Sequence, residues 1–250
     1  MTATAVRPTG PIPSPRAAVD DTASRTPGPG AAACRAVAYQ RVLHQLVRRE
    51  LRLLADLATW APADEPERTA ALTRHADLIS RVLLHHHRVE REAVWPALLR
   101  AAPDQARAAV DGWTARCARI DHMLRDVATA ARQWQVAGTA PARTAFAASC
   151  WKLADEVDAQ TDEEERTLLP LLAAHLAAED WTAIAARSHC RLSGPEQLLV
   201  LGLALEDSCA GDRARLIGGL PRSVRLAWRM HGERRYRAAV VRLRGAPPAA

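Results

Sequence analysis

The sequence contains few aromatic residues and almost no lysine. Its 250 residues include one Phe and two Tyr, and Lys152 is the only lysine. Ala, Leu and Arg dominate instead, and these residues favour helices, whereas strands are enriched in aromatic and β-branched residues. The composition therefore disfavours an extensive sheet and predicts an all-α fold. Arginine gives the chain a formal net charge of +6, which is only weak evidence for an anionic partner.

Cysteine pairs and long apolar runs are also missing. The five cysteines form neither an even set nor a C-x-x-C pair, so we expect neither a disulfide framework nor a zinc ribbon. A reducing cytoplasm fits this cysteine usage best. The chain shows no basic-then-apolar signal sequence, and its longest strongly apolar run, residues 198–205, is much shorter than a membrane span. We therefore expect a cytoplasmic protein with no membrane partner.

Proline and glycine divide the chain into helical segments. The Pro-rich residues 1–33 hold almost nothing large and apolar, so they predict a disordered tail. Apolar residues then recur at helical intervals in four segments, at about 34–60, 67–100, 104–136 and 142–178. Short connections between long helices are typical of an up-down-up-down four-helix bundle. We therefore expect a bundle at 34–178, a C-terminal helical extension at 179–244 and a second disordered tail at 245–250.

The second of these helices carries a pattern that suits a metal ion. His86 and Glu90 are four residues apart, so they project side by side from one face of a helix. Both offer atoms that first-row metal ions accept. The fourth helix repeats this spacing with Gln160 and Glu164, and in both helices a proline follows six residues after the glutamate. Together with His44 on the first helix, such inward-facing residues can converge on metal in a bundle core.

Three motifs carry a resemblance to a known family. The segments HQLVRREL, LLHHHRVEREAVWPALL and EEERTLLPLL resemble the hemerythrin-like (HHE cation-binding) domain in the version common in actinobacteria, and residues 192–244 resemble the C-terminal extension of those proteins. The resemblance implies a four-helix bundle that holds a non-haem di-iron centre. That centre would bind or react with dioxygen, peroxide or nitric oxide. By position, the resemblance implies metal ligands at His44, His86, Glu90 and Glu164.

Two positions depart from the pattern of that family. Cys117 on the third helix and Gln160 on the fourth stand where the resemblance implies ligand histidines. His122 follows five residues after Cys117, which is about 140° around a helix, so both cannot face the same core. Because Cys117 belongs to the apolar stripe of its helix, we expect His122 to face solvent. Asp121, four residues after Cys117, is the better inward candidate.

These departures affect one of two metal positions. The resemblance implies that the histidines of the first two helices serve one iron and those of the last two serve the other. The first position then keeps two histidines with carboxylates, which is close to the set of mononuclear non-haem iron oxygenases. The second has at most Cys117, Asp121 and Gln160, and Cys117 is alternatively a small buried hydrophobe. We interpret six further histidines as structural or surface residues: His75, His85, His87, His175, His189 and His231.

Three functions are compatible with this sequence. The first, which we favour, is a protein that binds one or two non-haem iron ions, or manganese, and carries, senses or detoxifies a small oxidant. The second is a non-haem iron oxidase or oxygenase that acts on an organic substrate at the altered site. The third is a metal-free interaction module. The Arg-rich last helix lacks a helix-turn-helix, a finger or an aromatic platform, which favours a solvated helix over a nucleic-acid partner.

Overall fold

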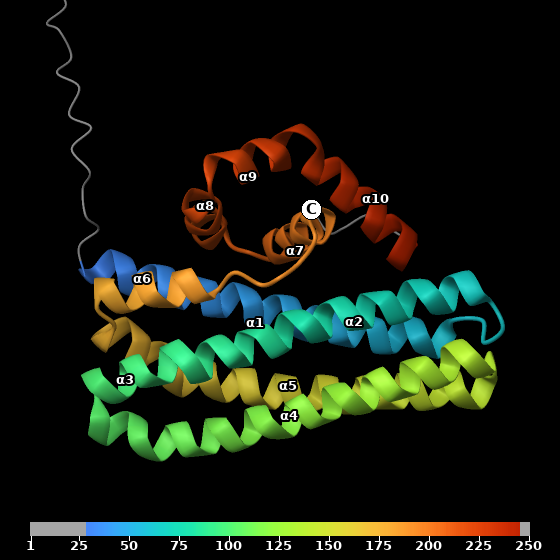
Figure 1. Ribbon diagram of the computed structural model, residues 1–250, viewed down its shortest axis with the longest axis horizontal. Helices are drawn as coiled ribbons and strands as arrows, with labels where there is room; N and C mark the ends of the chain where they lie inside the picture. The colour runs from blue at the N-terminus through green and yellow to red at the C-terminus, as the bar shows by residue number, and fades with distance from the viewer. Residues whose placement is uncertain (1–28, 246–250) are drawn as a thin grey trace, which may run out of the picture.

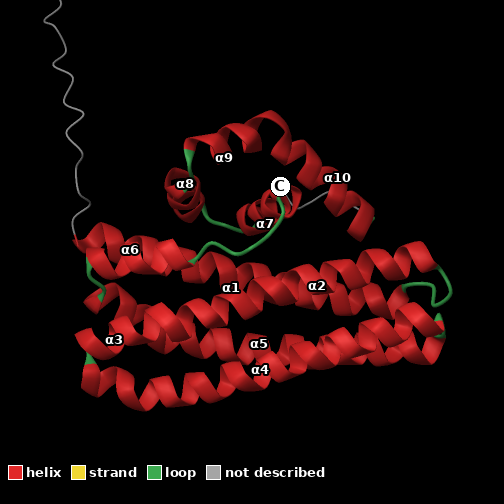
Figure 2. Ribbon diagram, viewed as in Figure 1, coloured by secondary structure: helices red, strands yellow, loops and turns green. Residues whose placement is uncertain are grey.

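The computed structural model describes residues 29–245, and every regular element in this range is a helix (Figure 2). Four long antiparallel rods lie side by side, and a smaller group of helices covers one side of them (Figure 1). The second rod is interrupted by a π-helical turn. The rods are α1 (Pro29–Trp60), α2 (Pro66–Val89) with η1 (Glu90–Val94) and α3 (Trp95–Ala101), α4 (Pro103–Ala137), and α5 (Ala140–His175).

The four rods form the up-down-up-down bundle that the sequence predicts. α1 packs against α2 and α5, and α4 packs against the same two helices from the other side. The connections are short because prolines and a glycine end the helices abruptly. Pro103 begins α4, and Gly138 ends it in the left-handed conformation with φ 59°. The prediction of an all-α bundle is thus confirmed.

The observed helix ends differ by a few residues from those expected. α1 begins at Pro29, inside the segment 1–33 that we expected to be a disordered tail, and proline suits the first turn of a helix. α5 ends at His175, three residues before the expected boundary at 178. The remainder of the N-terminal tail, residues 1–28, and residues 246–250 of the C-terminal tail lie outside the described residues.

A chain of short helices forms the extension after the bundle. It begins with α6 along the end of the bundle, and the remaining helices curve above α1 and α2 (Figure 1). α7 opens with a capping box, in which Glu196 accepts from the Ser193 backbone N–H at 2.8 Å. The helices are α6 (Ala178–Arg187), α7 (Gly194–Glu206), α8 (Ala210–Gly219), α9 (Arg222–Ala227), η2 (Trp228–Gly232) and α10 (Glu233–Arg244).

The extension shares its apolar core with the bundle. Leu203 of α7 and Tyr236 and Val240 of α10 belong to the same buried cluster as the interior residues of α1, α2, α4 and α5. Close approach of α7 and α10 depends on Gly202, because a side chain at this position would overlap the ring of Tyr236. Among the described residues, we find no helix with both the length and the apolar character needed to cross a membrane.

A buried charged network also joins the two parts. Glu50 of α1 accepts from Arg49 at 2.7 Å and from Arg244 of α10 at 2.6 Å. Its second oxygen lies 2.8 Å from His75 Nε2 of α2. Glu206 of α7 accepts from Arg244 at 2.7 Å. Buried charges require such partners, so the network fixes α7 and α10 against α1 and α2.

Candidate metal centre

Four residues bring metal-ligating atoms together in the bundle interior. His44 lies on α1, His86 on α2 and Glu164 on α5, while Glu90 begins the π-helical turn η1. His86 is 1% exposed and the other three are 0% exposed. One ligating atom from each residue lies within 4.8 Å of the other three. Three helices therefore contribute to one buried cluster, which brings together the four residues that the resemblance implied as metal ligands.

Several atoms of this cluster have no hydrogen-bond partner among the described residues. His44 Nε2 lies 3.2 Å from Glu164 Oε2, and His86 Nε2 lies 3.4 Å from Glu90 Oε1. The first pair lacks hydrogen-bond geometry, and neither ring nitrogen of His86 makes a hydrogen bond. Leaving buried polar atoms unpaired costs free energy. A cation between these atoms would satisfy them, so the donor set fits a metal ion.

The electrostatics of the cluster also favour a cation. Burial raises the pKa of Glu90 well above its usual range, and the nearby Glu164 raises it further. Burial lowers the pKa of His86 well below its usual value, and His44 acts in the same direction. Burial also lowers the pKa of His44, but Glu164 and Glu165 outweigh this effect and raise it. A divalent cation would relieve the repulsion between the two buried carboxylates and accept the neutral imidazole of His86 as a ligand.

Two residues that the sequence analysis did not identify contact His44 and Glu90 through hydrogen-bonding atoms. Glu165 Oε1 lies 3.3 Å from His44 Nδ1, and a carboxylate at the second ring nitrogen orients a ligating histidine. Gln40 Nε2 donates to Glu90 Oε1 at 3.0 Å. The sequence could have indicated these two contacts through the positions of the residues. Gln40 lies one helical turn before His44, and Glu165 directly follows Glu164.

A second group of potential ligands lies beside the first and includes His87. Ligating atoms of His87, Glu90 and Cys117 lie within 4.8 Å of one another, and all three side chains are buried. His87 Nδ1 lies 2.6 Å from Asp121 Oδ1. Sequence analysis placed His87 among the structural or surface histidines, whereas its position makes it a candidate ligand. The sequence signal for its burial was the apolar Leu83 one helical turn earlier, which the structure also buries.

Gln160 and Cys117 face each other across α4 and α5. Gln160 Nε2 donates to Cys117 Sγ at 3.3 Å and to Glu164 Oε1 at 2.6 Å. Cys117 Sγ in turn donates to Glu90 Oε2 at 3.9 Å. Burial raises the pKa of the Cys117 thiol well above its usual range, and both glutamates raise it further. A metal ion bound by this sulfur would therefore have to displace its proton.

Asp121 and His122 lie outside both groups. Asp121, which we expected to face inward, has a side chain that is 16% exposed and does not belong to either group. Its carboxylate contacts His87 of α2 and lies 3.2 Å from Arg91 Nη1 of η1. Burial raises the pKa of Asp121, but these two neighbours outweigh it and lower the pKa. The side chain of His122 is 66% exposed and lies 3.9 Å from Asp126.

A comparison with protein families agrees with this geometry. The family model described as the hemerythrin HHE cation binding domain matches residues 35–180. The chain belongs to this hemerythrin family. Comparisons with curated proteins and with solved structures give no match. The hemerythrin domain includes all four residues of the buried cluster, and α7 to α10 lie beyond the matched range.

A cavity of about 350 Å³ lies beside the cluster of the hemerythrin domain, between α1, α6 and α8. Tyr39 and Trp181 form part of its wall. The ring centroid of Tyr39 lies 6.5 Å from that of His86 and 6.2 Å from that of Trp181. None of the four cluster residues lines this cavity. Tyr39 thus separates the cavity from His86.

Proposed function

We propose that this hemerythrin-domain protein binds non-haem iron at His44, His86, Glu90 and Glu164. We further propose that it uses the iron to handle or sense dioxygen, hydrogen peroxide or nitric oxide. The observation that carries the proposal is the buried convergence of imidazole nitrogens and carboxylate oxygens without hydrogen-bond partners. Two imidazoles with carboxylates suit iron, whereas sites dominated by carboxylates suit manganese. Iron bound there would supply redox chemistry and coordination positions for a small oxidant.

The residues of the chain have separate roles in this proposal. His44 and His86 hold the metal ion, and Glu90 and Glu164 neutralise its charge. Glu165 orients His44 through its second ring nitrogen. The burial of all these ligands excludes bulk water from the site.

The size of the site favours a small oxidant over an organic substrate. The four ligating residues are at most 1% exposed. A diatomic molecule or a peroxide can therefore reach them more easily than a larger molecule can. An organic molecule in the neighbouring cavity would contact Tyr39 rather than the ligands. An oxidase or oxygenase function therefore requires Tyr39 to move.

We propose a second, weaker metal position at His87 and Cys117 with Glu90 shared between the two positions. Its support is the second group of buried ligating atoms. Imidazole, thiolate and carboxylate together form a softer set than the first position offers.

We also propose that the protein works in a reducing, cytoplasmic location. The free thiols of four cysteines support this proposal: Cys117, Cys150, Cys190 and Cys209.

Metal analysis of the full chain tests this function. The protein is loaded anaerobically with Fe(II) and Mn(II) together, desalted, and analysed for both metals per chain. It is then exposed to nitric oxide and followed by electron paramagnetic resonance. We expect one or two iron ions per chain and an iron–nitrosyl signal. A chain that retains no metal would instead be an interaction module, and retained manganese without iron would contradict the choice of metal.

A further inference from the structure

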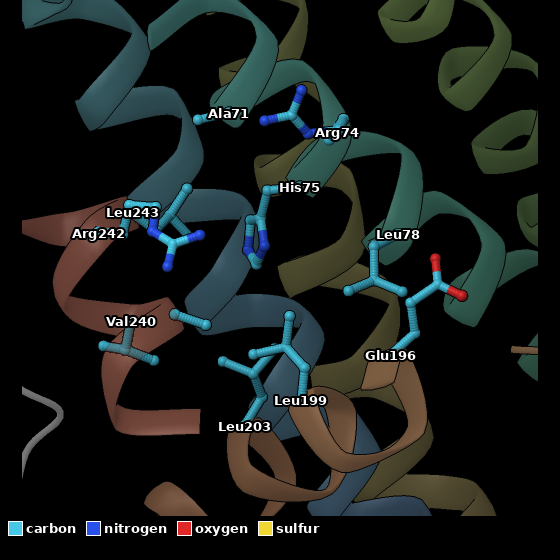
Figure 3. Close-up of a pocket in the computed structure, with 11 residues that line it drawn as sticks. Ala71, Arg74, His75, Leu78, Glu196, Leu199, Leu203, Val240, Arg242 and Leu243 are labelled. Carbon is cyan, nitrogen blue, oxygen red and sulfur yellow. The ribbon is translucent and has the colours of Figure 1, made fainter. Parts of the chain in front are cut away.

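A second cavity, of about 260 Å³, lies where the extension meets the bundle (Figure 3). α2 supplies one wall, and α7 and α10 supply the others. In Figure 3, His75 projects from α2 at the centre of the view, with Leu199 and Leu203 of α7 below it. No residue of the metal cluster lines this cavity.

Most of the cavity wall is apolar. Leu78 of α2, Leu199 and Leu203 of α7, and Val240 and Leu243 of α10 contribute aliphatic side chains. Among the described residues that line the cavity, Glu196 is the only acidic one, and its carboxylate is already bound by Arg81. A ligand would therefore gain mainly by burying hydrocarbon, as is usual for small-molecule pockets.

The cavity also has two cationic side chains at its rim. Arg74 of α2 and Arg242 of α10 are exposed and line it. Neither guanidinium forms an ion pair with any of the residues that the structure describes, unlike Arg244 nearby, which binds Glu50 and Glu206. His75, by contrast, is already held by Glu50 at 2.8 Å. The unpaired charges on the wall are thus both positive.

We propose that this cavity binds a small amphiphilic carboxylate, in which one carboxylate is attached to a short hydrocarbon chain or ring. The hydrocarbon would lie against the leucine side chains, and the carboxylate would lie between Arg74 and Arg242. The volume of about 260 Å³ exceeds the roughly 150 Å³ that accommodates benzene in an engineered cavity. It is slightly below the roughly 300–1,000 Å³ of pockets for drug-sized ligands, so the hydrocarbon part is short.

Calorimetric titration of the full chain with octanoate tests the proposal directly. Octanol provides the same chain without a carboxylate, and octylamine provides the opposite charge. We expect octanoate to bind once per chain and at least tenfold more tightly than either control. Equal affinity for octanoate and octanol, or no binding of octanoate, would overturn the proposal. The titration is performed without added metal, so its outcome is independent of the proposed iron site.

Methyl NMR of the same samples locates the ligand. Octanoate should shift the methyl signals of Leu199, Leu203 and Leu243 most strongly, because these side chains line the cavity. Shifts that are confined to residues outside the wall would show that octanoate binds elsewhere, and the proposal would then be wrong.

Charge-removing variants test the role of the rim. Arg74→Gln and Arg242→Gln should each weaken octanoate binding about fivefold, as for a partly exposed guanidinium–carboxylate pair, and should leave octanol binding unchanged. Both side chains are exposed, so folding should not be affected. Arg222→Gln is the matched control, because it removes the same charge from an exposed residue outside the cavity. Equal weakening in the control would indicate attraction by net charge alone and would refute a built site.

Discussion

The ring of His86 offers the most direct test of the metal site at the scale of single residues. Neither of its buried nitrogens has a hydrogen-bond partner in the part of the chain that the structure describes. We expect His86→Ala to lower bound iron and the stability of the iron-loaded protein together. A ligand present at 100 times its Kd stabilises the folded state by about 2.7 kcal/mol, and most of this gain should be lost. Iron per chain is measured by mass spectrometry and unfolding by circular dichroism.

His122→Ala is the matched control for this variant. It also removes one imidazole, but from a side chain that is 66% exposed. Its iron content and its unfolding temperature should equal those of the unaltered chain. Full iron occupancy in His86→Ala, or loss of iron in His122→Ala, would contradict the ligand assignment.

Asp121 should affect metal binding without touching the metal. Its carboxylate lies 2.6 Å from His87 Nδ1, and loss of such a partner behind a ligating histidine typically lowers metal affinity by about 10- to 100-fold. We expect Asp121→Asn to weaken the second metal position by this factor and to leave the first unchanged. Titration with Co(II), whose absorption reports a bound thiolate, measures the second position. Asp126→Asn, on the exposed face of the same helix, should have no effect.

The residues of the two buried groups differ in how far their positions could be predicted from the sequence. His86 and Glu90 could be predicted, because a spacing of four on one helix fixes their relative direction without knowledge of the partners. His87 could not be assigned in the same way. In a run of three histidines, each ring points about 100° from the next. All three are buried, so only the position of α4 decides which of them joins the second group. The orientation of Asp121 likewise depends on the rotation of α4 against α2.

The charged network around Glu50 has its effect at the scale of whole helices. Burial alone would raise the pKa of Glu50, but His75, Arg49 and Arg244 outweigh it and lower the pKa from 4.5 to about 2. A carboxylate with a lowered pKa stabilises the folded state above its unfolded pKa and loses this contribution as the pH falls through its folded pKa. The contribution is therefore complete above about pH 4.5 and disappears towards pH 2. Its size is roughly 3 kcal/mol.

We therefore predict that Glu50→Gln lowers the free energy of unfolding at neutral pH by roughly 3 kcal/mol. It should also reduce the loss of stability between about pH 4.5 and pH 2. Urea denaturation at a series of pH values measures both effects. Asp56→Asn, an exposed substitution on the same helix, should change neither quantity. Parallel pH dependence in Glu50→Gln and the unaltered chain would show that Glu50 does not couple the helices.

Sequence predicts the helices themselves better than the irregularities within them. Pro103, Gly138 and the capping box at Ser193 act locally, so the helix ends that depend on them could be located from the sequence. The π-helical turn at Glu90–Val94 could not be located in this way, since no residue type specifies one. In this turn, the Trp95 N–H bonds to the Glu90 carbonyl. The turn depends on how the segments before and after it pack in the bundle.

The shared core suggests that the whole molecule unfolds as one unit. Leu203, Tyr236 and Val240 of the extension are buried in the same cluster as the bundle interior. We predict that Gly202→Ala destabilises the chain by about 1–3 kcal/mol, as overpacking does in other cores, because the new methyl group would overlap Tyr236. Scanning calorimetry should show one transition that moves to lower temperature as a whole.

Gly218→Ala is the control for this substitution. Gly218 lies in helix α8, and a Cβ there would meet no atom within 4 Å. Replacing glycine by alanine in a helix is favourable by up to about 1 kcal/mol, so this variant should be unchanged or slightly more stable. A separate low-temperature transition in Gly202→Ala, with the main transition unmoved, would mean that the extension folds independently of the bundle.

The π-helical turn lets its segment hold an extra residue without turning the neighbouring helices away from the core. A π turn holds one residue more than the α-helical turn that it replaces. Deleting one residue from positions 91–93 would therefore let the segment close into an ordinary α-helix and leave the helices before and after it in nearly the same rotational phase, because the wider turn is what absorbs the extra residue. His86 lies before the turn, whereas the buried Trp95 and Leu98 lie after it. Related chains can therefore differ by one residue at this point and still keep both His86 and the core residues inward, whereas a deletion elsewhere in α2 would turn one of them away by about 100°.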